Sequence, residues 1–237
     1  MHFLGDEFMN ESIEGVNMNI ATEKVSNLSV LRLKIYQVIK DVFDILFSFF
    51  GIIVMLIVAI ILKISYMLAG DFHSIFFTQK RIGRNGKEFK LYKFRTMVPD
   101  AETKLKELIK EEPYKSQWKK NQKLDNDPRI TKIGNILRKT SLDELPQFIN
   151  IYIGDMSIIG PRPLVKGELD AHDGNHEIYE SVRPGITGWW ACNGRSATTY
   201  EKRLELEYYY VKNRSIILDL KCIFYTIKAI LFGKGAK

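Results

Sequence analysis

The most apolar segment of the chain is a run of eighteen positions without a charged residue, from Ile45 to Leu62. An α-helix over this run would be about 27 Å long, which is at the lower end of what crosses a bilayer. A helix that is apolar on every side can also lie inside a large soluble core, but a membrane position is the favoured interpretation. The pattern predicts a membrane-associated helix or helical hairpin over residues 35–66.

Basic residues lie on both sides of this apolar run, with Arg32, Lys34 and Lys40 before it and Lys63, Lys80 and Arg81 after it. Lys and Arg collect on the cytoplasmic side of a membrane, so two basic flanks favour a re-entrant hairpin with both ends on that side. A single span is the alternative, and Gly51 is the candidate for a break inside the run. The first 34 residues form a polar segment, which we expect to be a loose leader.

Residues 76–95 contain two β-prone stretches around Asn85-Gly86, which predicts a hairpin with a two-residue turn. The segment holds seven Lys and Arg residues against one Glu, in a chain whose formal net charge is +7. Such a surface could hold the phosphates of a small substrate, attract anionic lipid or bind nucleic acid, and it could also be a plain solvated hairpin. A neighbouring membrane segment disfavours nucleic acid.

Patterns typical of helices occupy residues 99–112, 132–139, 145–152, 200–212 and 215–232. The last of these is apolar with Lys221 and Lys228 on one face, which is typical of an interfacial helix, although a helix packed on the core fits equally well. The 237 residues, 46% of them hydrophobic, are enough for one domain with an appendage. We expect an α/β (α+β) protein with a polar leader (1–34), a membrane segment (35–66) and a compact cytosolic domain (67–237).

Two residue types that often bind metals give no strong site in this sequence. Cys192 and Cys222 lie 30 positions apart, without the spacing of a zinc site or a disulfide framework. His172 and His176 stand four positions apart, but Gly174 between them argues against the continuous helix that a metal pair would need. A zinc site is therefore disfavoured.

Asp143 and Glu144 are adjacent carboxylates in the segment TSLDELPQF, residues 140–148. The pair is open to two interpretations. Ser141 and Glu144 have capping-box spacing, so both carboxylates could simply stabilise the start of a helix. Alternatively, one carboxylate could bind a hard cation through oxygen while the other attacks phosphorus as a nucleophile.

Two arginines favour the second interpretation. Arg138 lies five positions before Asp143, and Arg162 lies between two prolines in the sequence GPRP, where a stiff backbone would hold its guanidinium in place. Together with the basic hairpin, they could offset the charge of a diphosphate bound with Mg²⁺. The turns at residues 183–189 and 193–195 could line a pocket or could be surface loops.

Five segments resemble the bacterial sugar transferases, the monotopic polyprenyl-phosphate phosphoglycosyl transferases: residues 77–97, 127–163, 182–190, 193–195 and 204–213. They occur in the family's order, and the resemblance covers about 35–232. The remaining leader is too short for the extra transmembrane bundle of larger members, so we expect the minimal form. The family usually has a Ser-Pro pair that breaks the membrane helix, whereas this chain has Ile52-Ile53 there, which leaves a re-entrant and a spanning helix both open.

The resemblance implies transfer of a sugar 1-phosphate from a UDP-sugar to undecaprenyl phosphate at the cytoplasmic face of the cell (inner) membrane. UMP would be released, at the first step of exopolysaccharide, capsule or glycan assembly. Asp143 matches the family's nucleophile, and Glu144 matches the residue that helps to hold Mg²⁺. Expected phosphate contacts are Arg138, Arg162, Lys93, Arg95 and Arg81, and a weaker nucleotide or sugar pocket is expected at Arg183, Asn193 and Arg195.

Two other functions stay open on sequence grounds. The chain could be a non-catalytic membrane-bound scaffold for glycan assembly that binds anionic lipid through the hairpin, or a membrane-anchored nucleic-acid binder. We expect no nucleic-acid partner and expect the lipid bilayer, the UDP-sugar and undecaprenyl phosphate as partners. The sequence leaves the transferred sugar and the oligomeric state open.

Overall fold

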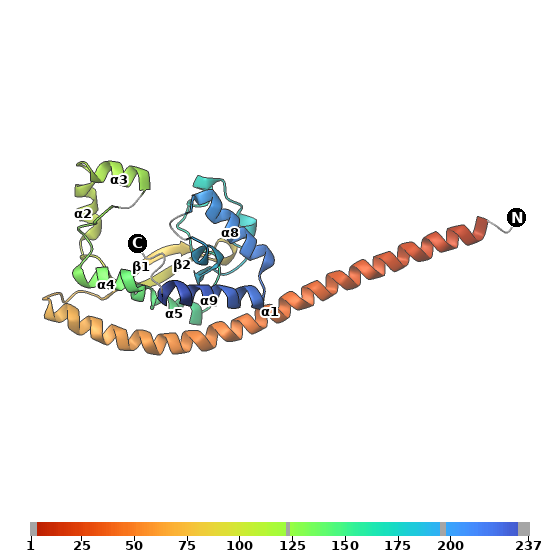
Figure 1. The fold of residues 1–237 in the computed structure, drawn as a ribbon, viewed down its shortest axis with the longest axis horizontal. Helices are drawn as coiled ribbons and strands as arrows, with labels where there is room; N and C mark the ends of the chain where they lie inside the picture. Colours follow the sequence, from red (N-terminus) through yellow and green to blue (C-terminus); the bar gives the residue numbers. More distant parts are fainter. Residues whose placement is uncertain (1–3, 122–123, 195–197, 232–237) are drawn as a thin grey trace. The chain divides into compact units, whose positions relative to one another are not determined.

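The computed structural model describes residues 4–121, 124–194 and 198–231, with side chains described for 30–119, 124–194 and 198–229. It consists of two compact units, Met1–Phe43 and Asp44–Lys237. Helix α1 (Leu4–Leu68) supplies the first unit and the opening helix of the second (Figure 1). The leader, expected to be loose, is helical from Leu4 onward. The leader contains no proline, and its Leu, Met, Ala and Glu residues favour helix.

Within the second unit, α1 packs against the rest of the domain along one narrow stripe. Its buried residues recur four or seven positions apart: Asp44, Ser48, Met55, Leu62 and Tyr66. This spacing places them on one side of the helix. The remaining positions of the helix leave large apolar side chains exposed, so the interpretation of this segment as a buried core helix is wrong. The stretch Val30–Leu68 is long and apolar enough to cross a membrane, by length and composition.

The apolar segment is one continuous helix and not a helical hairpin. No proline interrupts it, so the helix passes through Ile52 and Ile53 without a break. Gly51 permits close packing there. A Cβ atom on Gly51 would lie 2.4 Å from the ring of Phe148, on helix α5 (Gln147–Tyr152). The glycine therefore brings α5 against α1.

The predicted hairpin is confirmed. Strands β1 (Phe76–Ile82) and β2 (Glu88–Phe94) pair antiparallel, in a register that sets Phe77 opposite Lys93. The turn is closed by the backbone N–H of Lys87, which donates to the carbonyl oxygen of Arg84 at 3.4 Å. Asn85 and Gly86 at its centre both have positive φ, 58° and 72°. The last strand pair is Ile82 with Glu88, so residues 83–87 join the strands and the connection is longer than the predicted two-residue turn.

The predicted helices are also confirmed within the described residues: α2 (Ala101–Leu108), α4 (Lys132–Thr140), α5, α8 (Tyr200–Asn213) and α9 (Ile216–Leu231). The sequence pattern did not indicate the shorter elements. These are α3 (Tyr114–Asn121), β3 (Ser157–Ile159), α6 (His176–Tyr179), β4 (Gly185–Thr187), α7 (Trp189–Cys192) and the single 3₁₀ turns η1 (Arg84–Gly86), η2 (Leu142–Glu144) and η3 (Asp170–His172). The result is the expected mixed composition, rich in helix and with two small sheets.

The second sheet is a parallel pair, in which Ser157 lies opposite Gly185 and Ile159 opposite Thr187. Helices α8 and α9 pack on this pair through a buried cluster of Ile159, Tyr210, Val211, Leu218 and Cys222. A second cluster joins α1 to β2, α4 and η2, with Met55, Leu62, Tyr66, Phe94 and Leu137 buried in it. Between them, the two clusters fix the hairpin, η2 and the parallel strands around one cavity.

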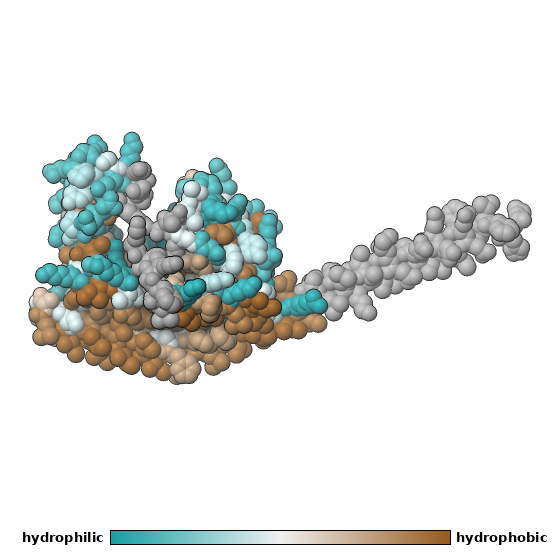
Figure 2. Space-filling view, in the orientation of Figure 1, coloured by the Kyte–Doolittle hydropathy of each residue, from teal (hydrophilic) through white to brown (hydrophobic). Residues whose placement is uncertain are grey.

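Hydrophobic side chains gather on one side of the second unit. Figure 2 shows this layer over α1, with α9 beside it. The exposed members of the layer on α9 include Ile217, Leu220 and Phe224, and those on α1 include Phe50 and Ile60, each 63% exposed. A patch of this extent marks a surface that meets another apolar phase or partner.

Candidate functional site

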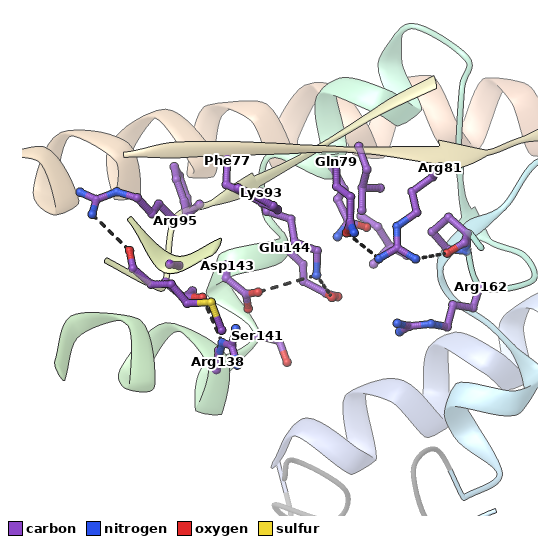
Figure 3. A pocket seen from close by; sticks show the side chains of 18 of the residues that line it. Phe77, Gln79, Arg81, Lys93, Arg95, Arg138, Ser141, Asp143, Glu144 and Arg162 are labelled. Atoms are coloured by element: carbon purple, nitrogen blue, oxygen red, sulfur yellow. Dashed lines mark hydrogen bonds and ion pairs between the residues drawn. The ribbon is translucent and has the colours of Figure 1, made fainter. Parts of the chain in front are cut away.

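An open cavity of about 850 Å³ lies in the second unit. Its walls come from the β1–β2 hairpin, residues 95–103, residues 138–147, and the loops at 160–163 and 185–191. The cavity contains most of the residues predicted for the site, drawn in Figure 3. The hairpin with residues 95–103, residues 138–147 and the two loops therefore meet at one place, although they are separate in sequence.

Asp143 and Glu144 lie on η2, and the side chains of both line the cavity. The capping-box interpretation of Ser141 and Glu144 is wrong. Ser141 has the left-handed conformation (φ 58°), where α4 ends, and its side chain makes no capping hydrogen bond. Glu144 instead faces Lys93: Lys93 Nζ donates to Glu144 Oε1 at 2.8 Å and lies 3.8 Å from Asp143 Oδ2.

The surroundings of Asp143 favour its neutral form more than those of an ordinary aspartate do. Its side chain is 13% exposed. Burial raises the pKa of Asp143, the positive charge of Lys93 opposes this shift, and the negative charge of Glu144 adds to it. Asp143 is thus a partly desolvated carboxylate whose ionised form depends on nearby cations.

A buried asparagine aligns Lys93 with the two carboxylates. Asn150 on α5 is fully buried; its Oδ1 accepts from the backbone N–H of Tyr92 at 3.0 Å, and its Nδ2 donates to the carbonyl oxygen of Lys90 at 2.7 Å. Helix α5 follows directly after η2, so these bonds fix β2 relative to the carboxylates. Sequence analysis did not identify Asn150, because a buried amide within a helix gives no local signal.

Arg138 reaches the cavity from the last turn of α4. The helix starts at Thr131, whose Oγ1 accepts from the N–H of Gly134 at 2.9 Å. A Cβ atom on Gly134 would lie 1.9 Å from the carbonyl oxygen of Thr96, so only glycine lets α4 pack this closely on the end of β2. Arg138 Nε then donates to Thr96 Oγ1 at 3.0 Å, which aligns the guanidinium with the cavity.

Arg162 and Arg81 form a second cationic group on the other side of Glu144 (Figure 3). The side chain of Arg162 is exposed, and its guanidinium makes no hydrogen bond or ion pair to a described residue. Arg81 donates to the carbonyl oxygen of Pro163 at 3.1 Å and to Gln79 Oε1 at 2.7 Å. Burial, with Arg162 nearby, lowers the pKa of Arg81 to about 10, so it remains cationic at neutral pH.

A buried glutamate supports the loop that carries Arg162. Glu207 of α8 is 1% exposed, and its Oε1 accepts from the backbone N–H of Arg162 at 3.0 Å. The hydroxyl of Tyr179 donates to the carbonyl oxygen of Arg162 at 2.9 Å. Burial raises the pKa of Glu207 to about 7. Sequence analysis also missed Glu207, because its role depends on a residue 45 positions away.

Arg95 is not placed as predicted, although its residue lines the cavity. All three of its nitrogen atoms donate within the protein: Nε to the carbonyl oxygen of Ser74 (2.7 Å), Nη1 to that of Met97 (3.2 Å) and Nη2 to Asp71 Oδ2 (2.8 Å). Its guanidinium also lies over the ring of Tyr66, 4.6 Å from the centroid. These contacts assign Arg95 to the fold.

Most of the residues predicted to form a nucleotide or sugar pocket do not come together in the structure. Arg183 is not among the cavity residues and pairs with buried Asp44 at 3.3 Å. Asn193 is exposed and donates to the carbonyl oxygen of Trp189 at 2.7 Å. Arg195 lies outside the described residues. The neighbouring residues Thr187, Gly188 and Trp190 do line the cavity.

The two histidines do not lie on one helix, as Gly174 indicated. His172 stacks on the ring of Tyr200, with centroids 3.5 Å apart. His176 hydrogen-bonds Asp170 and Glu180, each at 2.7 Å. These contacts account for both side chains without a metal.

The carboxylate pair fits a magnesium ion that a substrate helps to coordinate. Mg²⁺ commonly takes one or two carboxylates and completes its shell with waters and phosphate oxygens. Lys93 pairs with Oε1 of Glu144, and Oε2 has no hydrogen bond to a described residue. Among the described residues no group of three His, Cys, Asp or Glu side chains is arranged to hold a metal. Asp143 and Glu144 would therefore hold the ion together with a phosphate ligand.

Comparison with known proteins gives consistent matches. A family model described as bacterial sugar transferase matches residues 35–233. The chain is 41% identical over 198 residues to the exopolysaccharide production protein ExoY of Sinorhizobium fredii, covering 83% of this chain and 87% of that protein. It is 41% identical over 201 residues to the undecaprenyl-phosphate galactose phosphotransferase of Salmonella typhimurium, covering 84% of this chain and 41% of that protein.

A third relative is the UDP-N-acetylgalactosamine-undecaprenyl-phosphate N-acetylgalactosaminephosphotransferase of Aeromonas hydrophila, 36% identical over 219 residues, with 88% of this chain and 47% of that protein covered. The chain thus spans less than half the length of two of these relatives and most of the third. The family match covers most of the chain and includes every stretch that lines the cavity. This chain belongs to the bacterial sugar transferase family.

Proposed function

We propose that this protein is a phosphoglycosyl transferase that moves a sugar 1-phosphate from a UDP-sugar to undecaprenyl phosphate and releases UMP. One observation carries the proposal: a partly buried aspartate and a glutamate face a lysine within a cavity that is also lined by Arg81, Arg138 and Arg162. The relatives' names, which include undecaprenyl phosphate and a UDP-sugar, support the same assignment.

The first step would be attack by a carboxylate oxygen of Asp143 on the sugar-bearing phosphorus of the UDP-sugar. The bond from this phosphorus to the bridging oxygen breaks, and its electron pair leaves with UMP. The enzyme then carries the sugar phosphate as an acyl phosphate on Asp143. Lys93, Arg138 and Arg162 would offset the negative charge that otherwise repels the carboxylate from the diphosphate.

In the second step, a phosphate oxygen of the lipid attacks the same phosphorus. The bond to Asp143 breaks, and the carboxylate is regenerated without water or an outside oxidant. Splitting the transfer in two lets UMP leave before the lipid arrives. Glu144 and Asp143 would hold Mg²⁺, which when bound supplies charge neutralisation at the diphosphate oxygens.

We further propose that the second unit attaches to the cytoplasmic face of the membrane without crossing it. From Asp44 onward, α1 packs lengthwise on the domain by one stripe, so this part of the helix lies along the domain surface. Its apolar outer side and α9 would then rest in one membrane leaflet. Ile60→Glu, at an exposed outer position, should release the protein from liposomes in a flotation assay, whereas Lys104→Glu on α2 should not. Equal membrane binding of both variants would contradict this attachment.

The catalytic proposal is tested with purified protein, Mg²⁺ and a UDP-sugar in the absence of lipid. UDP-galactose and UDP-N-acetylgalactosamine are the first donors to try, because the relatives' names contain these sugars. We expect a burst of UMP equal to the enzyme present, and a mass gain of one sugar phosphate on the peptide that contains Asp143. Asp143→Asn, nearly isosteric but without an anionic oxygen, should give neither signal.

Asp71→Asn is the matched control, because Asp71 lies at Arg95 and not at the carboxylate pair. It should keep the burst in the protein that remains folded. An adduct on another residue, or a burst from Asp143→Asn, would reject Asp143 as the nucleophile. If no UDP-sugar yields UMP while the protein binds anionic liposomes, the scaffold function is favoured instead.

A further inference from the structure

We propose that the cavity binds its two substrates in a fixed orientation. The prenyl chain of the lipid acceptor lies over Phe77, and the nucleotide of the donor lies at Arg81 and Arg162. The carboxylate pair lies between the two ends. This inference rests on the proposed function and assigns its two substrates to opposite ends of one site.

This orientation of the substrates follows from the alternation of side chains along strand β1. Phe77, Gln79 and Arg81 are two positions apart, so they project from the same face of the strand, and all three line the cavity. Side chains therefore change along this face from aromatic to amide to guanidinium. Figure 3 shows Phe77 next to Lys93, with Gln79 and Arg81 farther along, on the side where Arg162 lies.

The Arg81 end is built for an anion. Arg81 Nε is buried without a hydrogen-bond partner among the described residues, although its two Nη atoms are bonded. A buried donor without a partner costs free energy unless a ligand or water satisfies it. Arg162 adds an exposed guanidinium beside it. The phosphate that leaves with the nucleoside is the donor's anionic part that this end would hold.

The Phe77 end has the opposite character. Phe77 is 46% exposed, an unusual exposure for an aromatic ring directly across the hairpin from Lys93. Phe77 lies at the end of β1 that is nearer to α1 in the chain, and Phe72, in the segment between α1 and β1, is 70% exposed. The outer edge of β1 is bridged at Ile82, whose N–H donates to the carbonyl oxygen of Leu164 at 2.8 Å, and among the described strands β1 pairs only with β2. Exposed aromatic surface therefore lies at the end of β1 that is nearer to α1 in the chain.

The chemistry limits how the two substrates can share the site. An in-line attack on the phosphorus held by Asp143 comes from the side that UMP has left, so the acceptor phosphate occupies the position vacated by the UMP phosphate. Only the groups attached to these phosphates can differ in position. A prenyl chain gains free energy by covering an exposed ring, whereas a nucleoside with its phosphate gains more at the arginines.

Separate measurement of the two half-reactions tests this orientation. In Phe77→Ala, the UMP burst from UDP-sugar should stay within about twofold of wild type, while the KM for polyprenyl phosphate should rise about tenfold, the cost of leaving one ring-sized apolar contact unmade. Arg81→Gln should weaken the burst at limiting UDP-sugar and raise the lipid KM as well, because the two phosphates occupy the same position in turn, so only Phe77→Ala should separate the two half-reactions. Phe76→Ala is the matched control, because its ring has similar exposure but projects from the other face of β1.

A saturated acceptor of equal length sharpens the result. Wild-type enzyme should prefer a prenyl phosphate to an alkyl phosphate of equal length, and Phe77→Ala should lose most of that preference. An unchanged lipid KM in Phe77→Ala, or an equal loss in its UMP burst, would overturn the proposed orientation while leaving the transferase function intact. A wild-type enzyme that gives no burst would instead overturn the function, and the inference with it.

Discussion

The ends of β2 and β3 each bring an arginine to the same cavity, and their surroundings are opposite. Arg95, after β2, is 8% exposed and donates to Ser74, Met97 and Asp71. Arg162, after β3, is exposed, and its guanidinium has no hydrogen bond to a described residue. At the first place the fold uses the charge of the arginine. At the second, that charge stays unpaired among the described residues.

The backbone of Arg162 is held instead of its side chain. Two prolines limit its rotation, and Glu207 and Tyr179 bond its N–H and its carbonyl oxygen. A guanidinium on a fixed backbone can meet a phosphate with little loss of conformational entropy. The comparison teaches that a binding arginine is recognised by what its side chain leaves unused, and not by its charge alone.

The largest effect on activity is expected from a change at Arg162, the arginine whose guanidinium is unpaired in the part of the chain that the structure describes. Arg162→Gln should lower kcat/KM for the UDP-sugar about a hundredfold, because a charge-assisted contact to phosphate is lost in the transition state. Its melting temperature should stay near that of wild type. Arg84→Gln, an exposed arginine of the hairpin turn outside the cavity, is the control for charge. Equal rates for the two variants would remove Arg162 from phosphate binding.

The next largest effect is a loss of stability on substitution of Arg95, the arginine that bonds within the fold. Arg95→Gln should lower the free energy of unfolding by about 2 kcal/mol, because Asp71 and two backbone carbonyls lose their charged donor. Protein that remains folded should keep kcat/KM within a few-fold of wild type. Thermal melting followed by circular dichroism, with Arg84→Gln again as control, measures the loss. An unchanged melting temperature together with lost activity would reverse the roles given to Arg95 and Arg162.

Glu207, which accepts a hydrogen bond from the backbone of Arg162, should make the free energy of unfolding depend on pH. The folded-state pKa of Glu207, about 7, lies above its unfolded value, so folding favours the protonated form. The contribution of Glu207 to the free energy of unfolding is fully present below pH 4.5, and it is lost as the pH rises through 7. Wild type should therefore lose roughly 2 kcal/mol between pH 5 and 8, and Glu207→Gln should remove this part of the slope. Parallel slopes in both proteins would exclude Glu207 as the cause.

The smallest effect concerns the nucleophile. Only ionised Asp143 can attack phosphorus, and burial raises its pKa, so the UMP burst rate should fall on acidification at a higher pH than an ordinary aspartate would give. The charge of Glu144 adds to this shift. Glu144→Gln should therefore move the acid limb of the burst rate to lower pH, apart from its loss of rate. A limb that moves to higher pH would contradict the electrostatic role given to Glu144.

Local sequence was sufficient for the elements with local signals. Asn85-Gly86 fixed the hairpin because residues that tolerate positive φ are needed at the centre of its turn, and periodic apolar positions located the helices α4, α5, α8 and α9. β3 and β4 were missed because each has three residues, and they pair across a gap of more than 25 positions. The unbroken helix at Ile52-Ile53 follows from the absence of proline there, the departure from the family pattern that had left both a re-entrant and a continuous helix open.

For the site, the sequence determined which side chains carry charge and which segments are stiff: the adjacent carboxylates, the basic strand and the Arg162 loop. Only tertiary structure decided which of these charges remain available. Arg183 pairs with Asp44, 139 positions away, and Arg95 with Asp71, whereas Lys93 is delivered to Glu144 by an asparagine from α5. The reason is physical: a buried charge takes whichever partner packing brings within hydrogen-bond distance, and that distance is set by contacts between segments remote in sequence.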